Sequence, residues 1–224
     1  DIQYLENLRN LEKKELVTVG CPYLDEAFTN LNKYEKTDEF TVLVSPTWGP
    51  SGLLTKYGQK LLESLATTGW KIIVRPHPQS KSSEADLLEK LTEHFKDNKN
   101  IIWDYEKDNM IAMSKSDIMI SDFSGIIFDY VFLFNNPLLF VDVNFDKTPY
   151  DLDDLPHEAW QFETLNKIGV QIKEEDFSNI KSIIENSVSS EQLINNRQIA
   201  KSEAWMYQNE SARRVVDFLI SKKK

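Results

Sequence analysis

Short apolar runs alternate along this chain of 224 residues with stretches that have helical spacing. The runs are rich in β-branched residues, and several of them, such as TVLV and KIIV, are apolar at every position, as expected of strands buried on both faces. We expect strands at 16–19, 40–45, 71–75, 101–103, 118–121, 137–141 and 169–172. We expect helices at 55–67, 84–96, 108–114, 125–134 and 177–187, and one long final helix at 190–220.

Strands that alternate with crossover helices are typical of a parallel sheet covered on both faces. The predicted fold class is therefore α/β, with a Rossmann-like, doubly wound parallel sheet over 16–189. Residues 1–15 form a leading segment, and 190–224 form a C-terminal helix that packs on the domain or crosses from it. The stretch TPYDLDDLPHE at 148–158 is acidic and contains prolines, so we expect a long surface loop there.

Composition narrows the classes of partner. A net charge of −10 argues against broad binding to nucleic acid or to anionic lipid, and no apolar run approaches the roughly 18–20 residues of a membrane span. The single cysteine, Cys21, excludes an internal disulfide framework and fits a reducing cytoplasm. Three scattered histidines and one distant cysteine lack the spacing of metal ligands, so we predict no metal site and interpret His94 and His157 as surface residues.

Ligands of doubly wound sheets bind beyond the carboxyl ends of the strands, so the residues that follow each strand are the candidates for function. The first such loop is SPTWGPSG at 45–52, where two prolines and two glycines predict a fixed backbone. The simplest interpretation is a tight connection with Trp48 packed on the core. The loop matches neither GxGxxG nor GxxxxGK[ST].

The second loop is RPHPQ at 75–79. His77 lies between two prolines, so a stiff loop presents its imidazole, and Arg75 adds a permanent cation beside it. An isolated histidine is more often structural than catalytic. The position of His77 at a strand end keeps both interpretations open.

The third loop is SDFSG at 121–125, followed by an apolar helix. We expect Ser124 to cap this helix and Gly125 to let a ligand approach its first turn, where exposed N–H groups and the helix dipole suit a phosphate. Asp122 opposes a bare anion, so we expect it to orient a hydroxyl or a neighbouring donor. Asp129 lies in an otherwise apolar helix, where a carboxylate is unfavourable unless it is paired or reaches a ligand.

Six short motifs, taken in order, resemble the CDP-glycerol glycerophosphotransferase family, the enzymes that build teichoic-acid-like polyol phosphate polymers. The similarity covers roughly residues 16–220. The motifs are VGCPYLD at 19–25, SPTW at 45–48, RPHP at 75–78, SDFSGIIFDY at 121–130, PLLF at 137–140 and NESARRVVDFL at 209–219.

The resemblance implies a GT-B fold, in which two Rossmann-like domains face each other across the active site. This chain is similar to the carboxyl-terminal half, which binds the nucleotide donor, and the acceptor-binding half would lie before Asp1, consistent with a chain that does not begin with Met. By the resemblance, His77 and the loop from Ser121 to Ser124 contact the donor pyrophosphate, and Asp129 lies near the ribose or another hydroxyl. The implied donor-binding residues are Thr47, Trp48, Arg75, His77, Ser121, Asp122, Ser124, Gly125 and Asp129, with His77 also catalytic.

The sequence departs from the family pattern at three places. Gly49 follows PTW where a basic residue is common, Gly125 replaces a second serine, and Tyr23 replaces an arginine. The loss of two cations weakens the binding of a diphosphate unless Arg75 or a lysine compensates. These changes leave the identity of the donor open.

The predicted function is transfer of glycerol phosphate, or a related polyol phosphate, from a CDP-activated donor to a hydroxyl of a polymer or lipid-linked acceptor, with CMP leaving. His77 can stabilise the phosphate when protonated or act as a base when neutral, and we favour the first role. No cofactor or metal is required if the helix N-terminus and His77 carry the charge.

Two alternatives remain from other classes. One is a GT-B glycosyltransferase that uses a nucleotide sugar to build capsule or surface polysaccharide. The other is a catalytically idle nucleotide-binding module. In each case we expect a cytoplasmic protein, with any contact to the inner face of the membrane made by parts outside this chain.

Overall fold

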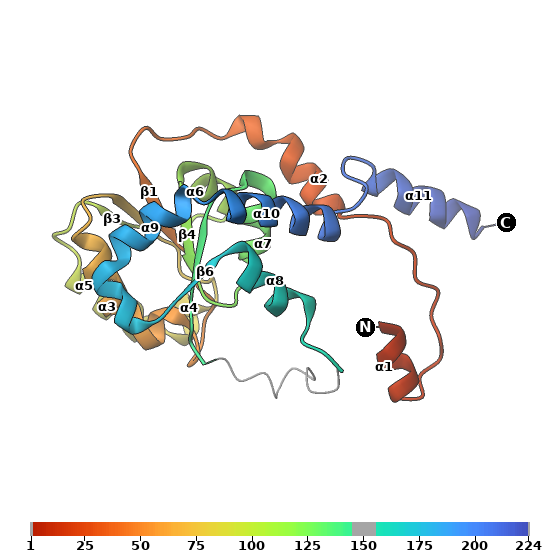
Figure 1. The fold of residues 1–224 in the computed structure, drawn as a ribbon, viewed down its shortest axis with the longest axis horizontal. Coiled ribbons are helices and arrows are strands. Elements are labelled where there is room, and N and C mark those ends of the chain that lie inside the picture. The colour runs from red at the N-terminus through yellow and green to blue at the C-terminus, as the bar shows by residue number, and fades with distance from the viewer. Residues whose placement is uncertain (1, 145–155, 224) are drawn as a thin grey trace.

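The computed structural model describes residues 2–144 and 156–223. Its centre is a six-stranded parallel sheet in the order β3-β2-β1-β4-β5-β6 (Figure 1). The strands are β1 (Thr41–Val44), β2 (Lys71–Val74), β3 (Ile101–Trp103), β4 (Ile118–Ser121), β5 (Leu138–Val141) and β6 (Val170–Ile172).

The strand order reverses between β1 and β4, which lie side by side although two strands separate them along the chain. Val42 pairs with Ile118 and Val44 with Ile120. In a doubly wound sheet, this reversal opens a crevice beyond the carboxyl ends of the two strands. The predicted α/β fold class is confirmed, and the loops after β1, β2 and β4 meet at this crevice.

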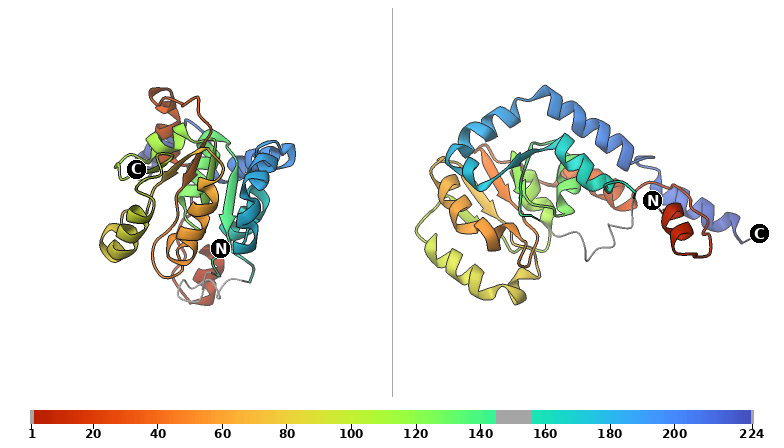
Figure 2. Two further views of the ribbon diagram at one scale, coloured as in Figure 1. Left: turned by 90° about the vertical axis from the view of Figure 1, so that its left-hand side faces the viewer. Right: turned by 60° about the horizontal axis from the view of Figure 1, so that its bottom comes forward.

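Helices cover both faces of the sheet (Figure 2). The first face carries α3 (Leu53–Ala66), α5 (Ala85–His94) and α9 (Ile180–Val188), and the second face carries α2 (Pro22–Thr29), α6 (Asn109–Lys115), α7 (Ile126–Phe134), α8 (Trp160–Ile168) and α10 (Glu191–Ala204). The shorter elements and the two ends are α1 (Ile2–Leu8), η1 (Leu31–Lys33), α4 (Ser80–Ser83), η4 (Glu174–Asn179) and α11 (Ser211–Ser221).

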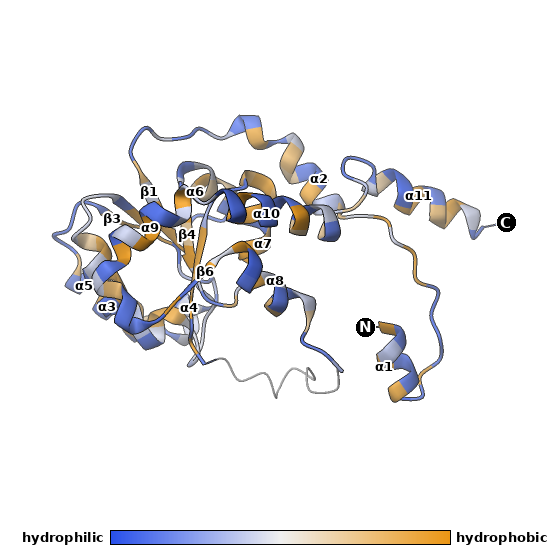
Figure 3. Cartoon of the chain, viewed as in Figure 1, coloured by the Kyte–Doolittle hydropathy of each residue, from blue (hydrophilic) through white to orange (hydrophobic). Residues whose placement is uncertain are grey.

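Alternate residues of each central strand enter opposite cores. Val42 and Val44 pack against the first layer of helices, and Leu43 packs against the second. All three side chains are fully buried, which explains why TVLV is apolar at every position. In Figure 3, the central strand β4 is orange, and the surrounding helices alternate orange and blue.

The expected final helix at 190–220 is wrong, because residues 205–210 divide it into α10 and α11. Tyr207 and Asn209 have φ values of 55° and 64°, which no α-helix accommodates. The carboxylate of Asp25 on α2 stabilises the conformation of this break. It accepts hydrogen bonds from Trp205 Nε1 at 2.7 Å, from Asn209 N at 2.8 Å and from Ser211 N at 3.0 Å. Beyond the break, α11 extends away from the domain (Figure 1).

The expected strand at 16–19 is also wrong, because this segment has no sheet partner among the described residues. It leads instead to Gly20, which has a φ of 92° and lies against Ser211. A Cβ atom at position 20 would lie 2.3 Å from Ser211 Oγ. The motifs VGCPYLD and NESARRVVDFL therefore contact each other where α2 packs against the start of α11.

Two helices that cover the sheet, α2 and α8, were not predicted from the sequence. Each is short and begins in a stretch that contains prolines or polar residues. Most of the predicted loop at 148–158 lies outside the described residues, and its last three residues, 156–158, are exposed.

Candidate functional site

Three loops meet where the strand order reverses, and they enclose a pocket of about 430 Å³. They are the loops that follow β1, β2 and β4, and the N-terminus of α6 closes the remaining side. The lining residues are Ser45, Pro46, Arg75, Pro76, His77, Pro78, Lys107, Asn109, Ser124, Gly125 and Ile126. Of the nine predicted donor-binding residues, the pocket brings together Arg75, His77, Ser124 and Gly125.

His77 presents one specific nitrogen to this pocket. Its Nδ1 accepts a hydrogen bond from the backbone N–H of Gln79 at 3.1 Å, so Nε2 carries the proton of the neutral imidazole. Burial lowers the pKa of His77, and the nearby Glu84 carboxylate offsets part of that shift. Without a ligand, burial therefore favours the neutral imidazole with its proton on Nε2. The role that we favoured from the sequence, a protonated His77 that stabilises a phosphate, stays a prediction.

Trp48 does not pack on the core, contrary to the simplest interpretation of its loop. Its side chain is 44% exposed, and its ring lies near that of His77, with centroids 6.3 Å apart and planes 30° apart. The neighbouring Gly49 has a φ of 92°, a conformation that a lysine or arginine rarely adopts. The backbone of the loop thus explains the missing basic residue after PTW.

Arg75 is engaged within the protein. Its guanidinium forms an ion pair with Asp104 and donates a hydrogen bond from Nη2 to the carbonyl oxygen of Glu106 at 2.7 Å. Arg75 therefore ties the exit of β2 to that of β3. Its charge is largely neutralised before any ligand enters the pocket.

Lys107 and Asn109 also line the pocket, and neither was predicted as a site residue. Lys107 is exposed and forms no ion pair within the described part of the chain. Lys107, on the loop before α6, thus places one lysine at the pocket, whereas the sequence had left open whether Arg75 or a lysine compensates for the absent family cations. The polar segment DYEKDN, which follows β3 at the same edge of the sheet, could have signalled this side of the pocket.

Ser121 and Asp122 lie beneath the pocket, where they organise its loops. Ser121 Oγ donates a hydrogen bond to the carbonyl oxygen of Ser45 at 2.6 Å. The Asp122 carboxylate accepts from Thr47 N at 3.0 Å, from Leu53 N at 3.0 Å and from Ser124 N at 3.2 Å. Burial raises the pKa of Asp122, and these backbone hydrogen bonds oppose that shift. Asp122 thus joins the loop after β1, the start of α3 and the loop after β4.

The first turn of α7 faces the pocket through Ser124, Gly125 and Ile126. Ser124 is not the N-cap that we expected, because Gly125 occupies that position and no side chain caps the helix. Gly125 is exposed, and a Cβ atom there would meet nothing within 4 Å. The N-terminal end of α7 is therefore open to a ligand, which is the arrangement that suits an anion.

Asp129 lies one turn further along α7, beside the pocket but outside its lining. Its carboxylate accepts a hydrogen bond from the Tyr23 hydroxyl of α2 at 3.3 Å, and Asn109 lies next to the same hydroxyl. Burial raises the pKa of Asp129, and the hydrogen bond from Tyr23 lowers it in part. The helix carboxylate noted in the sequence is thus paired, and Asn109 connects the pair to the pocket.

Within 2–144 and 156–223, no group of three or more His, Cys, Asp or Glu side chains is placed to hold a metal ion. No helix in the described part of the chain combines the length and the apolar character that crossing a membrane requires. His94 and His157 are exposed, as expected.

The chain matches the model of the family CDP-Glycerol:Poly(glycerophosphate) glycerophosphotransferase over residues 1–221. It belongs to this family. No curated protein matches it in sequence.

Solved structures share the fold. The wall teichoic acid polymerase TagF aligns with a TM-score of 0.50 at 21% identity, over 90% of this chain and 47% of that one. The Methanocaldococcus jannaschii UDP-GlcNAc 2-epimerase, in complex with UDP-GlcNAc and UDP, gives a TM-score of 0.60 at 14% identity, over 96% and 57%. Anabaena HepE, in complex with UDP and glucose, gives 0.53 at 13% identity, over 90% and 53%. The chain thus spans about half the length of each structure and has the Rossmann-like fold of one half of a GT-B protein.

Proposed function

We propose that this chain is the donor-binding half of a transferase that moves glycerol phosphate, or a related polyol phosphate, from a CDP-linked donor to an acceptor hydroxyl. The observation that carries the proposal is the convergence of His77, Lys107 and the open N-terminus of α7 on one pocket. Membership of the glycerophosphotransferase family and the TagF-like fold support it. Further support comes from a TagF structure soaked with CDPG, which shares the fold at a TM-score of 0.51 and 20% identity.

The volume and charge of the pocket suit a nucleoside diphosphate. At about 430 Å³, it falls in the range of small-molecule sites, roughly 300–1,000 Å³. The diphosphate would lie between the first turn of α7 and Lys107, and Nε2–H of His77 would donate to a phosphate oxygen. Asp129 and Tyr23 would form hydrogen bonds with a ribose hydroxyl that lies beside Asn109, at the edge of the pocket.

In the transfer, the acceptor oxygen attacks the phosphorus distal to cytidine, and the bond from that phosphorus to the bridging oxygen breaks. CMP leaves with the bonding electrons, and the acceptor proton passes to a base. Neutral His77 holds its proton on Nε2. Its role in the proposal is to donate a hydrogen bond to the phosphate oxygens, on which negative charge develops. Positioning and charge stabilisation are the main demands of phosphoryl transfer, and His77, Lys107 and the first turn of α7 contribute to both.

Calorimetric titration with CDP-glycerol, CDP-ribitol and UDP- and GDP-sugars tests the proposal. We expect a CDP-linked polyol to bind most tightly, and His77→Ala to weaken that binding. His94→Ala is the matched control, because His94 is an exposed histidine on α5, away from the pocket. Tighter binding of a UDP- or GDP-sugar would instead favour a glycosyltransferase, and absence of nucleotide binding would overturn the proposal.

A further inference from the structure

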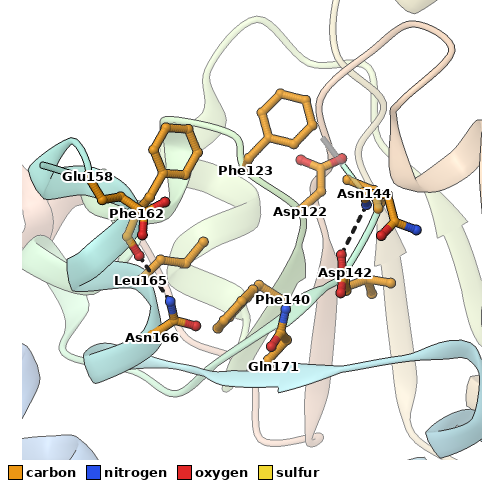
Figure 4. Close-up of a pocket in the computed structure, with 12 residues that line it drawn as sticks. Asp122, Phe123, Phe140, Asp142, Asn144, Glu158, Phe162, Leu165, Asn166 and Gln171 are labelled. Carbon is orange, nitrogen blue, oxygen red and sulfur yellow. Dashed lines mark hydrogen bonds between the residues drawn. The ribbon is translucent and has the colours of Figure 1, made fainter. Parts of the chain in front are cut away.

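A second pocket lies on the opposite side of the loop that follows β4 (Figure 4). It has a volume of about 260 Å³ and is formed by the ends of β5 and β6, the start of α8 and the Asp122-Phe123 segment. None of the nine predicted site residues except Asp122 lines it. Among the described residues, the lining consists of Asp122, Phe123, Phe140, Val141, Asp142, Val143, Asn144, Glu158, Phe162, Leu165, Asn166 and Gln171.

The lining combines flat apolar rings with hydrogen-bonding groups. Phe123, Phe140 and Phe162 provide the rings, and Figure 4 shows them around the same hollow as the side chains of Asn166 and Gln171. The Asn166 amide is oriented, because its Nδ2 donates to the carbonyl oxygen of Phe162 at 3.2 Å. Two carboxylate acceptors also line the hollow: Asp142 follows β5, and Glu158 lies on the other side, beside Phe162.

The charge of this pocket disfavours an anion. Asp122, Asp142 and Glu158 are acidic, and none of the described lining residues is a lysine or an arginine. Lys56 lies at the edge, but its ammonium group is engaged with the carbonyl oxygen of Val143. A diphosphate entering this pocket would meet carboxylates rather than cations, so the pocket suits a part of the substrate that carries no negative charge.

Size and hydrogen-bonding chemistry narrow the choice further. About 260 Å³ lies below the range of roughly 300–1,000 Å³ typical of drug-sized ligands, so the pocket suits a fragment smaller than a nucleotide. Hydroxyl groups that donate to the Asp142 carboxylate and accept from the Gln171 amide would complement the polar lining. The phenylalanine rings would cover the C–H groups of the same fragment.

A third, smaller hollow shares lining residues with both pockets. It has a volume of about 170 Å³ and is lined by Ser124 and Gly125 on the side of the first pocket and by Phe123, Phe162 and Leu165 on the side of the second. The three hollows thus follow the loop after β4 from one side to the other. A ligand whose phosphate lies at Gly125 could extend a hydroxylated group towards Asp142.

We propose that the pocket between β5, β6 and α8 is a polyol subsite that binds an uncharged, hydroxyl-rich unit such as glycerol. This proposal rests on the function proposed above and assigns the part of the substrate that the first pocket does not hold. The unit belongs either to the donor, as the transferred polyol, or to the acceptor, as its terminal polyol. The hydroxyl groups of either unit would form the same hydrogen bonds with the pocket.

Two variants test the subsite without changing its backbone. Gln171→Leu removes an exposed polar side chain on β6, and Asp142→Asn keeps the acceptor that holds Asn144 N at 3.0 Å while removing the charge. The control is Gln198→Leu, an equivalent change at an exposed position of α10. Affinities for CDP, CDP-glycerol and a short glycerol phosphate oligomer are measured by calorimetry, with the unfolding midpoint of each variant as a check of folding.

We expect each subsite variant to lose about fivefold in one polyol-dependent affinity, because one hydrogen bond contributes about 1 kcal/mol. If the polyol belongs to the donor, the advantage of CDP-glycerol over CDP falls while the affinity for CDP stays unchanged. If it belongs to the acceptor, affinity for the oligomer falls and both nucleotide affinities stay unchanged. If both polyol-dependent affinities match those of the control while CDP still binds, the subsite proposal is wrong. Absence of CDP binding in the unchanged chain would overturn the proposed function itself.

Discussion

The two pockets on either side of the Ser121–Gly125 loop differ in charge although they share one loop. The first contains His77, Lys107 and the positive end of α7, and none of its described lining residues is acidic. The second contains Asp122, Asp142 and Glu158 with amides and aromatic rings. A strand order that reverses between β1 and β4 places both at the same edge of the sheet.

The difference indicates how a chain of net charge −10 would bind the anionic donor that we propose. Its negative charge is not spread evenly, because cations and helix N–H groups gather on one side of the loop and carboxylates on the other. A substrate that contains both a diphosphate and a neutral polyol would be oriented by this contrast. Asp122, buried between the pockets, fixes the loops on which the contrast depends.

The largest effect is expected for Asp122→Ala, which should release the loops that separate the two pockets. The backbone N–H groups of Thr47, Leu53 and Ser124 lose their common acceptor, so we expect a loss of about 3 kcal/mol in the free energy of unfolding. Urea unfolding measures it, and nucleotide binding should be lost in parallel. A loss of less than about 1 kcal/mol would mean that Asp122 does not organise the loops.

The next largest effect is expected for His77→Ala, which should change the first pocket alone. Loss of one hydrogen bond to a charged phosphate lowers the affinity for CDP-glycerol by about 2 kcal/mol, or roughly 30-fold. His77→Gln keeps a donor near the same place and should recover part of the affinity. Equal affinity in all three proteins, measured by calorimetry, would contradict the assignment of Nε2.

A smaller effect, which depends on salt, is expected for Lys107→Ala. An exposed lysine beside a diphosphate contributes through a screened Coulomb interaction, so we expect about a fivefold loss of affinity at low salt that shrinks at high salt. The control is Lys60→Ala, because Lys60 is an exposed lysine paired with Glu174 on another face. If the loss persists unchanged at high salt, Lys107 acts through packing or geometry rather than charge.

The smallest effect is expected for Asp129→Asn, because Asp129 lies outside the lining of the first pocket. If Asp129 meets the ribose, the preference for CDP over 2′-deoxy-CDP should fall about threefold, the equivalent of one weak hydrogen bond. Tyr23→Phe keeps the carboxylate and should alter this preference less. An unchanged preference in Asp129→Asn, measured by calorimetry, would restrict Asp129 to its bond with Tyr23.

Much of the fold could be predicted from the sequence because the buried strands are uniformly apolar. TVLV and KIIV are strands with helices on both faces, as their pattern indicates. The segment at 16–19 has the same β-branched character but no neighbouring strand among the described residues, and only the tertiary structure decides that. The break at 205–210 depends on Asp25, which lies 180 residues before Trp205, so helical spacing alone could not reveal it.

The candidate site was predicted unevenly for a similar reason. His77, Ser124 and Gly125 follow strands directly, and the parallel sheet brings such residues together. Asp122 was expected to orient a hydroxyl or a neighbouring donor, and it does bind neighbouring donors. The sequence could not identify these donors, because Thr47 N and Leu53 N belong to a different loop and to the start of α3. The second pocket was missed because its polar residues, such as Asn166 and Gln171, come from α8 and β6 and form no motif in the sequence.

The most direct test of the division between the two pockets is the change in backbone amide resonances when CDP is added to the chain. With CDP, we expect shifts at Gly125 and Ile126 in the first turn of α7 and none at Gln171 or Asn166. With CDP-glycerol, we expect further shifts at Gln171 if the polyol belongs to the donor. Shifts that centre on Gln171 and Asn166 with CDP alone, or no shift at Gly125, would contradict this division.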